Sequence, residues 1–138
     1  MDNLTDLKRR ILAELEEAGE EDVAALINSF AKRRGAADEI DQMSTALASL
    51  LHSNFLEISR SRDKVSLRWA PLPQEESQAL VSDLRSCFQW SDRDHLWNWR
   101  KDRPRAEAIL TNAGLVEARK ILSEDGWPDS RGQTAEPQ

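Results

Sequence analysis

The apolar residues of this chain change period partway along it, and that change constrains the fold more than any other feature. Residues 4–18, 20–34 and 38–53 place apolar side chains three or four positions apart, which predicts three amphipathic α-helices. Residues 64–69 instead alternate polar and apolar side chains, the period of a half-buried strand. With residues 55–58 across a polar turn, they predict a β-hairpin with a basic tip. The sequence therefore predicts an α+β fold that is mainly helical.

The ends of the three helices are marked by residues that favour termination. Gly19 and Gly35 follow the first two helices and Asn54 follows the third, and both residue types tolerate the left-handed conformation that stops a helix. We expect the acidic residues 20–22 to form the first turn of the second helix, because negative charge is favoured beside its free amide groups.

The second half of the chain predicts a helix, a strand pair and a final helix. Residues 73–88 place apolar side chains on one helical face. Residues 95–99 alternate again, and we expect them to turn and pair with residues 106–110. Thr111 is the expected cap of the last helix, which Gly126 ends.

These elements predict two structural units and a tail. Residues 1–72 form the unit of three helices and a hairpin, and residues 73–127 form an extension that packs on it or mediates dimerisation. Residues 128–138 are polar and carry no apolar stripe, so we expect them to be disordered.

Residues 46–58, Ala-Leu-Ala-Ser-Leu-Leu-His-Ser-Asn-Phe-Leu-Glu-Ile, look like a recognition helix that runs into a wing strand. In winged helix-turn-helix proteins, a Leu-x-x-Leu pattern is followed by a glycine or asparagine turn and then an apolar-Glu-apolar strand. Residues 4–70 carry this resemblance to winged helix-turn-helix domains. It implies a protein whose third helix enters the major groove of double-stranded DNA.

Residues 110–118, which begin Leu-Thr-Asn-Ala-Gly, are similar to the Leu-Thr-x-x-Gly signature of MarR-like and PadR-like regulators. In those families the second wing strand ends there and a dimerisation helix begins, so the resemblance implies a homodimeric transcription regulator. Thr111 would cap that helix, and Gly114 would allow close backbone packing. The signature directly follows the wing in those families, whereas here residues 74–105 intervene. That segment is either an insertion in the wing or part of a second unit.

The charge pattern gives DNA a local place to bind. A net charge of −6 argues against a protein that coats nucleic acid by bulk electrostatics, but residues 58–72 carry four basic side chains and one acidic one. The predicted phosphate contacts lie after the second helix and on the wing: Lys32, Arg33, Arg34, Arg60, Arg62 and Lys64. The predicted groove contacts are polar residues of the third helix: Gln42, Thr45 and Ser49.

The same helix also supports a second interpretation without DNA. Residues 38–53 contain no Arg or Lys and begin with Asp38, Glu39 and Asp41, whose charges would repel phosphate. The basic residues would then form a solvated face and a favourable helix terminus. On this interpretation the chain is a protein-interaction module that uses a winged-helix scaffold without binding DNA.

Tryptophans gather in the second half of the chain, at positions 90, 97, 99 and 127. They serve either as core, the commoner role of aromatic residues, or as a partner surface, because Trp and Arg dominate binding hot spots. The partner-binding residues of the second interpretation are Trp97, Trp99, Arg100 and Arg103. Aromatic and basic residues are also interleaved at 97–101, as in proteins that stack single-stranded bases.

No constellation in the sequence indicates catalysis, a metal or a cofactor. His52, Cys87 and His95 lack the spacing of metal ligands, and no nucleophile–base pair can be named. We therefore expect a protein that is not an enzyme and binds no cofactor. No apolar run approaches the roughly 20 residues of a membrane span, so no membrane partner is expected. The acidic start and the single cysteine predict a cytoplasmic protein.

Overall fold

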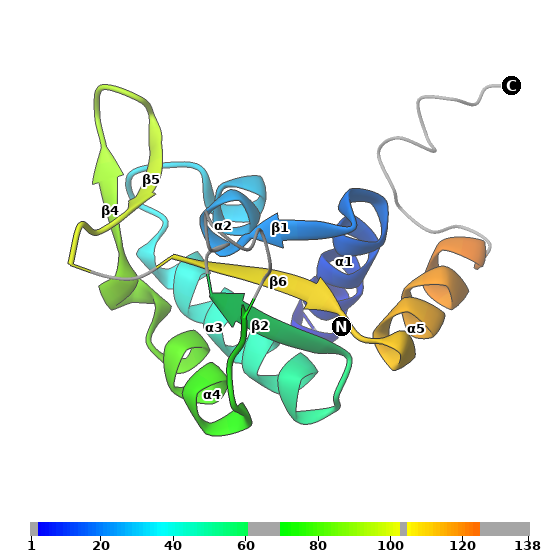
Figure 1. The fold of residues 1–138 in the computed structure, drawn as a ribbon. Coiled ribbons are helices and arrows are strands. Elements are labelled where there is room, and N and C mark those ends of the chain that lie inside the picture. Colours follow the sequence, from blue (N-terminus) through cyan, green and yellow to red (C-terminus); the bar gives the residue numbers. More distant parts are fainter. Residues whose placement is uncertain (1–2, 61–69, 103–104, 125–138) are drawn as a thin grey trace, which may run out of the picture.

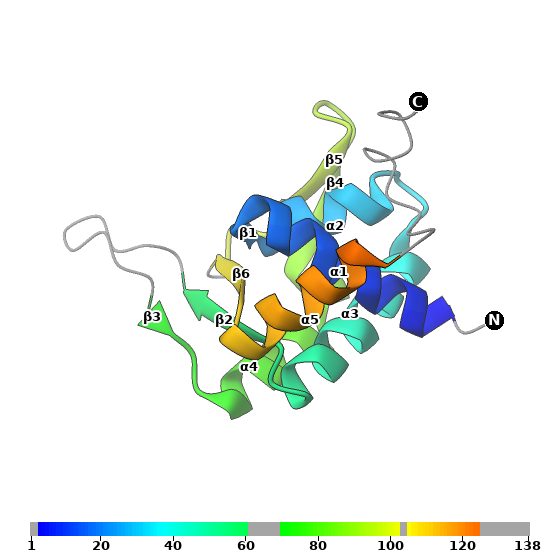
Figure 2. The same cartoon turned by 90° about the vertical axis from the view of Figure 1, so that its right-hand side faces the viewer.

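The structure, a computed structural model, describes residues 3–60, 70–102 and 105–124 and combines α-helices with antiparallel strands (Figure 1). Three helices pack against one face of a four-stranded sheet, and a two-stranded hairpin projects from one side (Figure 1). A fourth helix lies beside the third, and a fifth lies against the first (Figure 2).

The three predicted N-terminal helices are present as α1 (Asn3–Ala18), α2 (Val23–Ala31) and α3 (Ala37–His52). Gly19 follows α1 with φ +86°, and Asn54 follows α3 with φ +63°, so both take the left-handed conformation that the sequence predicted. The α2 helix ends at Ala31, before the basic residues that were predicted in its last turn. The apolar stripes of the helices meet in one core, whose fully buried side chains include Ile11, Leu15, Leu26, Ile27, Ile40 and Leu47.

The acidic residues 20–22 form a strand, β1 (Glu20–Asp22), and the prediction that they open the second helix is wrong. Their partner is a strand far along the chain, with Glu20 opposite Ile109 and Asp22 opposite Glu107. Local charge favours a helix start here, but pairing with a distant strand satisfies the backbone groups instead. Only Asp22 keeps a helical role, because its Oδ1 accepts the Ala24 amide as the cap of α2.

The sheet has the strand order β1-β6-β2-β3 and joins both halves of the chain. Strand β2 (Leu56–Arg60) pairs on one side with the short β3 (Ala70–Pro71) and on the other with β6 (Ala106–Leu110). The predicted wing turn and the strand at 64–69 lie outside the described residues. The expectation that 106–110 pairs with 95–99 is wrong, because β6 fills the central position between β1 and β2.

The strand pair of the second half uses different partners from those predicted. Helix α4 (Gln74–Ser82) and a 3₁₀ turn, η1 (Leu84–Cys87), replace the single helix predicted over 73–88. The chain then extends into β4 (Phe88–Ser91), which pairs with β5 (Leu96–Trp99) across a tight turn. Phe88, which was predicted on the helix, lies opposite Trp99 in this strand pair, with ring centroids 4.6 Å apart.

Helix α5 (Asn112–Ser123) begins as the sequence predicted, with the Thr111 hydroxyl accepting the Gly114 amide at 3.0 Å. Gly114 lies against the chain that leaves α3: a Cβ at this position would fall 1.8 Å from the Phe55 carbonyl oxygen. Only glycine fits such a close backbone approach. The predicted end at Gly126 and the tail 128–138 lie outside the described residues.

The apolar side of α5 is occupied within the chain. Ala118 and Ile121 are almost fully buried, and α5 packs along α1 (Figure 2). The ion pairs Arg9–Glu124 and Arg119–Glu16 also join α1 to α5 and its C-terminal cap. Among the described residues Val116 is the one large hydrophobic side chain that α5 leaves exposed. The face through which dimerisation was predicted is therefore covered by α1.

Candidate nucleic-acid interface

Helix α3, the predicted recognition helix, exposes only a narrow row of side chains. Seven of its residues are buried, and the exposed ones are Asp38, Asp41, Gln42, Thr45 and His52. The α4 helix lies alongside α3, where Gln74 Nε2 donates to the Leu51 carbonyl at 3.4 Å and Gln78 Nε2 donates to the Ala48 carbonyl at 3.3 Å. Part of the surface that would approach a DNA groove is thus taken by the chain itself.

The N-terminal end of α3 keeps its acidic character in the structure. Arg85, on η1, pairs with the carboxylates of Asp41 and Asp38. Arg33 pairs with Glu39, and this hydrogen bond lowers the pKa of the Glu39 carboxyl below its ordinary value. Three carboxylates thus lie at the end of the helix where base contacts are normally made, and negative charge there opposes phosphate.

The three predicted groove contacts are not equally available. Gln42 and Thr45 are exposed, and the Thr45 hydroxyl donates to the Asp41 carbonyl at 3.3 Å. Ser49 is half-buried and accepts a hydrogen bond from Lys8 Nζ at 3.2 Å. A row of this kind offers few groups for reading base edges.

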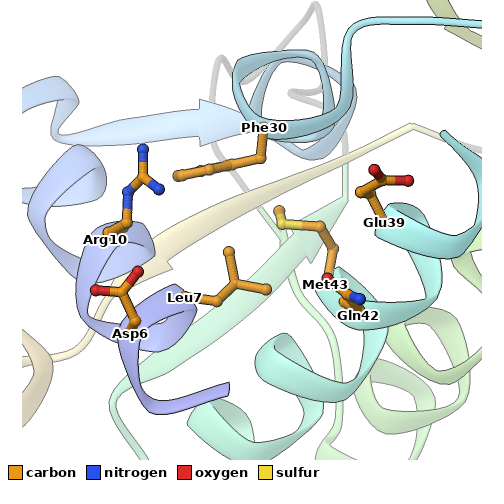
Figure 3. A pocket seen from close by; sticks show the side chains of 7 residues that line it. All are labelled: Asp6, Leu7, Arg10, Phe30, Glu39, Gln42 and Met43. Atoms are coloured by element: carbon orange, nitrogen blue, oxygen red, sulfur yellow. The ribbon is translucent and has the colours of Figure 1, made fainter. Parts of the chain in front are cut away.

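Gln42 also borders a shallow groove of about 220 Å³ between α1, α2 and α3. Figure 3 shows Asp6 and Arg10 on the α1 side and Glu39 and Gln42 on the α3 side, with Phe30 between them. The Arg10 guanidinium lies over the Phe30 ring, 5.6 Å from its centroid. Two carboxylates flank this groove against one cation, so its charge does not favour phosphate.

Three of the four predicted phosphate contacts in the described part of the chain are paired with carboxylates. Besides the Arg33–Glu39 pair, Arg34 Nη1 lies 3.4 Å from an Asp92 oxygen, and Arg60 Nη2 lies 3.7 Å from a Glu76 oxygen. Exposed pairs of this kind are weak, about 0–1 kcal/mol, so phosphate can replace the carboxylate. Lys32 is exposed at the end of α2. Arg62 and Lys64 lie outside the described residues.

Trp97, one of the predicted partner-binding residues, belongs to the core. It is 9 % exposed, and its Nε1 donates to the Ala31 carbonyl at 2.7 Å. Its backbone is held by Asn28 of α2, whose amide accepts from Trp97 N at 2.8 Å and donates to Trp97 O at 2.9 Å. The side chain anchors the β4–β5 hairpin to α2 and is not available to a partner.

The remaining residues of that segment surround a basic cavity of about 320 Å³ beside the hairpin. Six residues line it, and they include three cations and no carboxylate: Ala24, Asn98, Trp99, Arg100, Lys101 and Arg105. We call this the basic cavity. The three cationic side chains are exposed, whereas Trp99 and Asn98 are half-buried. Arg103, also predicted here, lies outside the described residues.

Asp22 holds two residues that line the basic cavity, Trp99 and Arg105. Its Oδ1 accepts from Trp99 Nε1 at 2.7 Å, and its Oδ2 lies 3.1 Å from Arg105 Nη2. The indole ring of Trp99 also packs against the Phe88 ring across the hairpin. Trp99 therefore has a fixed position before any ligand arrives, and the Asp22 side chain is itself mostly buried.

The basic cavity opens at the end of the sheet from which the predicted wing extends. Arg60, the last residue of β2, pairs with Ala106, the first residue of β6. Arg105 directly precedes β6, so Arg60 and the cavity residues share this end of the sheet. Lys101, the third cation of the basic cavity, forms no ion pair with any carboxylate in the described part of the chain.

The predicted partner-binding residues include Trp99 and Arg100, and Asn98 lies within the same interleaved run, whereas Asp22 and Arg105 were not predicted as site residues. The interleaved run at 97–101 was a usable signal, and Lys101 lay inside it. Asp22 and Arg105 are 83 residues apart in the chain, and only the pairing of β1 with β6 brings them together. No local pattern carries that information.

The chain matches no known protein-family model, and no curated protein and no solved structure is similar to it. Within the described residues, no group of His, Cys, Asp and Glu side chains is placed to hold a metal ion. No helix in that same part of the chain has the length and apolar character of a membrane span. Cys87 is buried in the core.

Proposed function

We propose that this chain is a nucleic-acid-binding protein of winged-helix type that holds phosphates at the basic cavity and not through α3. The observation that carries the proposal is the charge contrast between the two surfaces. Three cations and no carboxylate line the basic cavity. The exposed row of α3 has two carboxylates, Asp38 and Asp41, and no Lys or Arg.

The winged-helix frame is supported by the order of the elements. Three helices are followed by β2, which pairs with β3 beyond the predicted wing turn and with β6 on its other side. In this frame residues 72–105 are inserted between β3 and β6, which pair with opposite edges of β2. The insertion carries both α4, which lies along α3, and the hairpin that forms the basic cavity.

Phosphate binding at such a site is driven by counterion release and falls with salt. A protein that neutralises three phosphates has a slope of log K against log salt of about −2 to −3. Arg100 and Arg105 are 48 % and 64 % exposed, so both can turn from their present carboxylate partners, Asp102 and Asp22, toward a phosphate. We expect little sequence preference, because α3 offers few groups for base readout.

The test is fluorescence anisotropy with a mixed-sequence duplex and with one of its strands, at roughly 50 mM and 200 mM salt. The test variant is R100Q/K101Q/R105Q. The matched control is R9Q/R119Q/K120Q, which makes the same change in net charge on α1 and α5. We expect wild type and control to bind at low salt with a loss of roughly 16- to 64-fold at high salt. The test variant is expected to bind much more weakly.

Equal binding by the two triple variants would place the contact elsewhere on the chain. No binding by the wild type to either probe at low salt would remove nucleic acid as the partner. Thermal melting of each variant checks that the comparison is made between folded proteins.

A second function, a protein-interaction module without DNA, is favoured by the acidic row of α3. Asp38 and Asp41 lie on an exposed helix end and would suit a basic segment of a partner protein. The variant D38N/D41N separates the two functions. It should leave nucleic-acid binding unchanged or slightly stronger, and it should abolish binding to a basic partner peptide.

A further inference from the structure

We infer that the basic cavity selects single-stranded over duplex nucleic acid, because Trp99 offers a fixed platform on which one unpaired base can stack. This inference rests on the proposed function and names the class of nucleic acid. Base–aromatic stacking requires a base that has left its own stack, whereas phosphate contacts alone do not distinguish a strand from a duplex.

The first support is that Trp99 is both accessible and immobilised. It lines the cavity and is half-buried, so part of the indole faces the open volume. Its Nε1 is held by Asp22, and the ring packs against Phe88. A ring held in this way loses little conformational freedom when a base stacks on it.

The second support is the composition of the cavity around the indole. Arg100, Lys101 and Arg105 supply charge for the phosphates on either side of a nucleotide, and Asn98 supplies an amide that can donate to or accept from a base edge. A volume of about 320 Å³ lies within the range of small-molecule sites, roughly 300–1,000 Å³. The cavity thus has room for a single base.

The third support is that the other two described tryptophans do not border the basic cavity. Trp97 is in the core, and the Trp90 Nε1 donates to Asp92 at 3.0 Å at the other end of the hairpin. Trp90 also contacts Trp97 edge to face, with ring centroids 5.5 Å apart. Of the described tryptophans, Trp99 is the one that borders the basic cavity.

The experiment compares a labelled single strand of about 12 thymidines with a hairpin duplex of similar charge, titrated with the full chain at low salt. The variants are Trp99→Leu, which removes stacking, and Trp99→Phe, which keeps an aromatic ring but loses the bond to Asp22. The control is Trp90→Leu, which removes a tryptophan from the same hairpin. Wild type and control should prefer the single strand. Trp99→Leu should weaken single-strand binding by about 5- to 100-fold, and leave the salt slope and duplex binding unchanged.

Trp99→Phe should retain most of the single-strand preference. A readout that needs no variant is ultraviolet cross-linking of a bromouridine-substituted strand to the wild type, followed by peptide mapping, which should identify Trp99. Equal affinity for strand and duplex, or a cross-link that maps elsewhere, overturns the inference. If the strand preference or the cross-link fails but R100Q/K101Q/R105Q still binds weakly, the proposed function stands and only the single-strand inference is lost. If the wild type binds neither probe, both the proposed function and the inference are lost.

Discussion

The Asp22 carboxylate joins Trp99 of the hairpin to the first turn of α2. Its Oδ1 accepts from Trp99 Nε1 and from Ala24 N, each at 2.7 Å, and its Oδ2 pairs with Arg105. One side chain at the end of β1 thus caps a helix, orients an indole and holds a cation. Through Asp22, the helices and the sheet position the basic cavity, although most of the residues that line it belong to the inserted segment.

Asp22 is therefore expected to matter for stability. Asp22→Ala should lower the free energy of unfolding by about 2–3 kcal/mol, because it removes a helix cap and the hydrogen bond of a half-buried indole. Asp22→Asn keeps an oxygen for both bonds and should cost less than about 1 kcal/mol, the strength of the exposed pair with Arg105. Urea denaturation measures both values. An alanine variant as stable as the asparagine variant would show that the hydrogen bonds accepted by Asp22 do not stabilise the fold.

A second prediction concerns the hairpin anchor. Asn28→Ala leaves the amide and carbonyl of Trp97 without their partner and should cost about 2–4 kcal/mol. Gln89→Ala, at an exposed position of β4, should change stability by less than about 0.5 kcal/mol. Thermal melting compares the two. Equal melting temperatures would mean that the hairpin docks on α2 through Trp97 alone.

The local features of the sequence predicted the local features of the fold. The apolar stripes predicted α1 and α3, and Gly19, Asn54 and Thr111 ended or capped helices as expected. These depend on periods and backbone preferences that a short segment carries by itself.

The strand pairings could not be predicted in the same way. Residues 20–22 have the charges of a helix start, and their role as a strand depends on β6, almost ninety residues later. Residues 106–110 were expected beside 95–99, but the nearest strand in sequence was not the partner. The candidate site follows these pairings, so Trp99 and Arg100 were found from a local run, whereas Asp22 and Arg105 were not.

A third prediction tests the close approach at the start of α5. Gly114→Ala places a Cβ against the Phe55 carbonyl and should destabilise the chain by about 1–3 kcal/mol, the cost of overpacking a rigid backbone contact. Gly35→Ala is the comparison, because a Cβ there meets only the far end of the Arg33 side chain, at 3.5 Å. Denaturant midpoints of the two variants give the answer. Similar midpoints would show that the backbone at Phe55 can move.

A fourth prediction concerns oligomeric state. The apolar side of α5 is packed on α1, and Val116 is 70 % exposed among charged neighbours. One exposed valine supplies far less area than the roughly 1,200 Å² of a stable interface. We expect sedimentation equilibrium at tens of micromolar to give the mass of a monomer, and Val116→Lys to leave that mass unchanged. A dimer that Val116→Lys dissociates would restore α5 as a dimerisation helix.

The last prediction is a loss of stability as pH rises, caused by Glu21. Burial, a hydrogen bond with Glu14 and the nearby charges of Glu14, Glu107 and Asp22 raise the pKa of Glu21 to about 8. Its Oε1 is buried without a hydrogen-bond partner among the described residues. Between pH 4.5 and about 8, the folded chain keeps the proton and the unfolded chain releases it. Unfolding therefore becomes easier as pH rises through this window, and the effect levels off above it.

Glu21→Gln removes this titration and keeps a donor for Glu14. The full pKa shift corresponds to roughly 5 kcal/mol. Because Glu21 is partly exposed, we expect solvent screening to leave a gain of about 1–2 kcal/mol for the variant near pH 9. The gain should vanish well below pH 4.5, where the wild-type carboxyl holds its proton in both states. Urea denaturation across this range measures it, with Glu20→Gln on the other side of β1 as the control. A difference that does not grow with pH would show that Glu21 ionises normally in the folded chain.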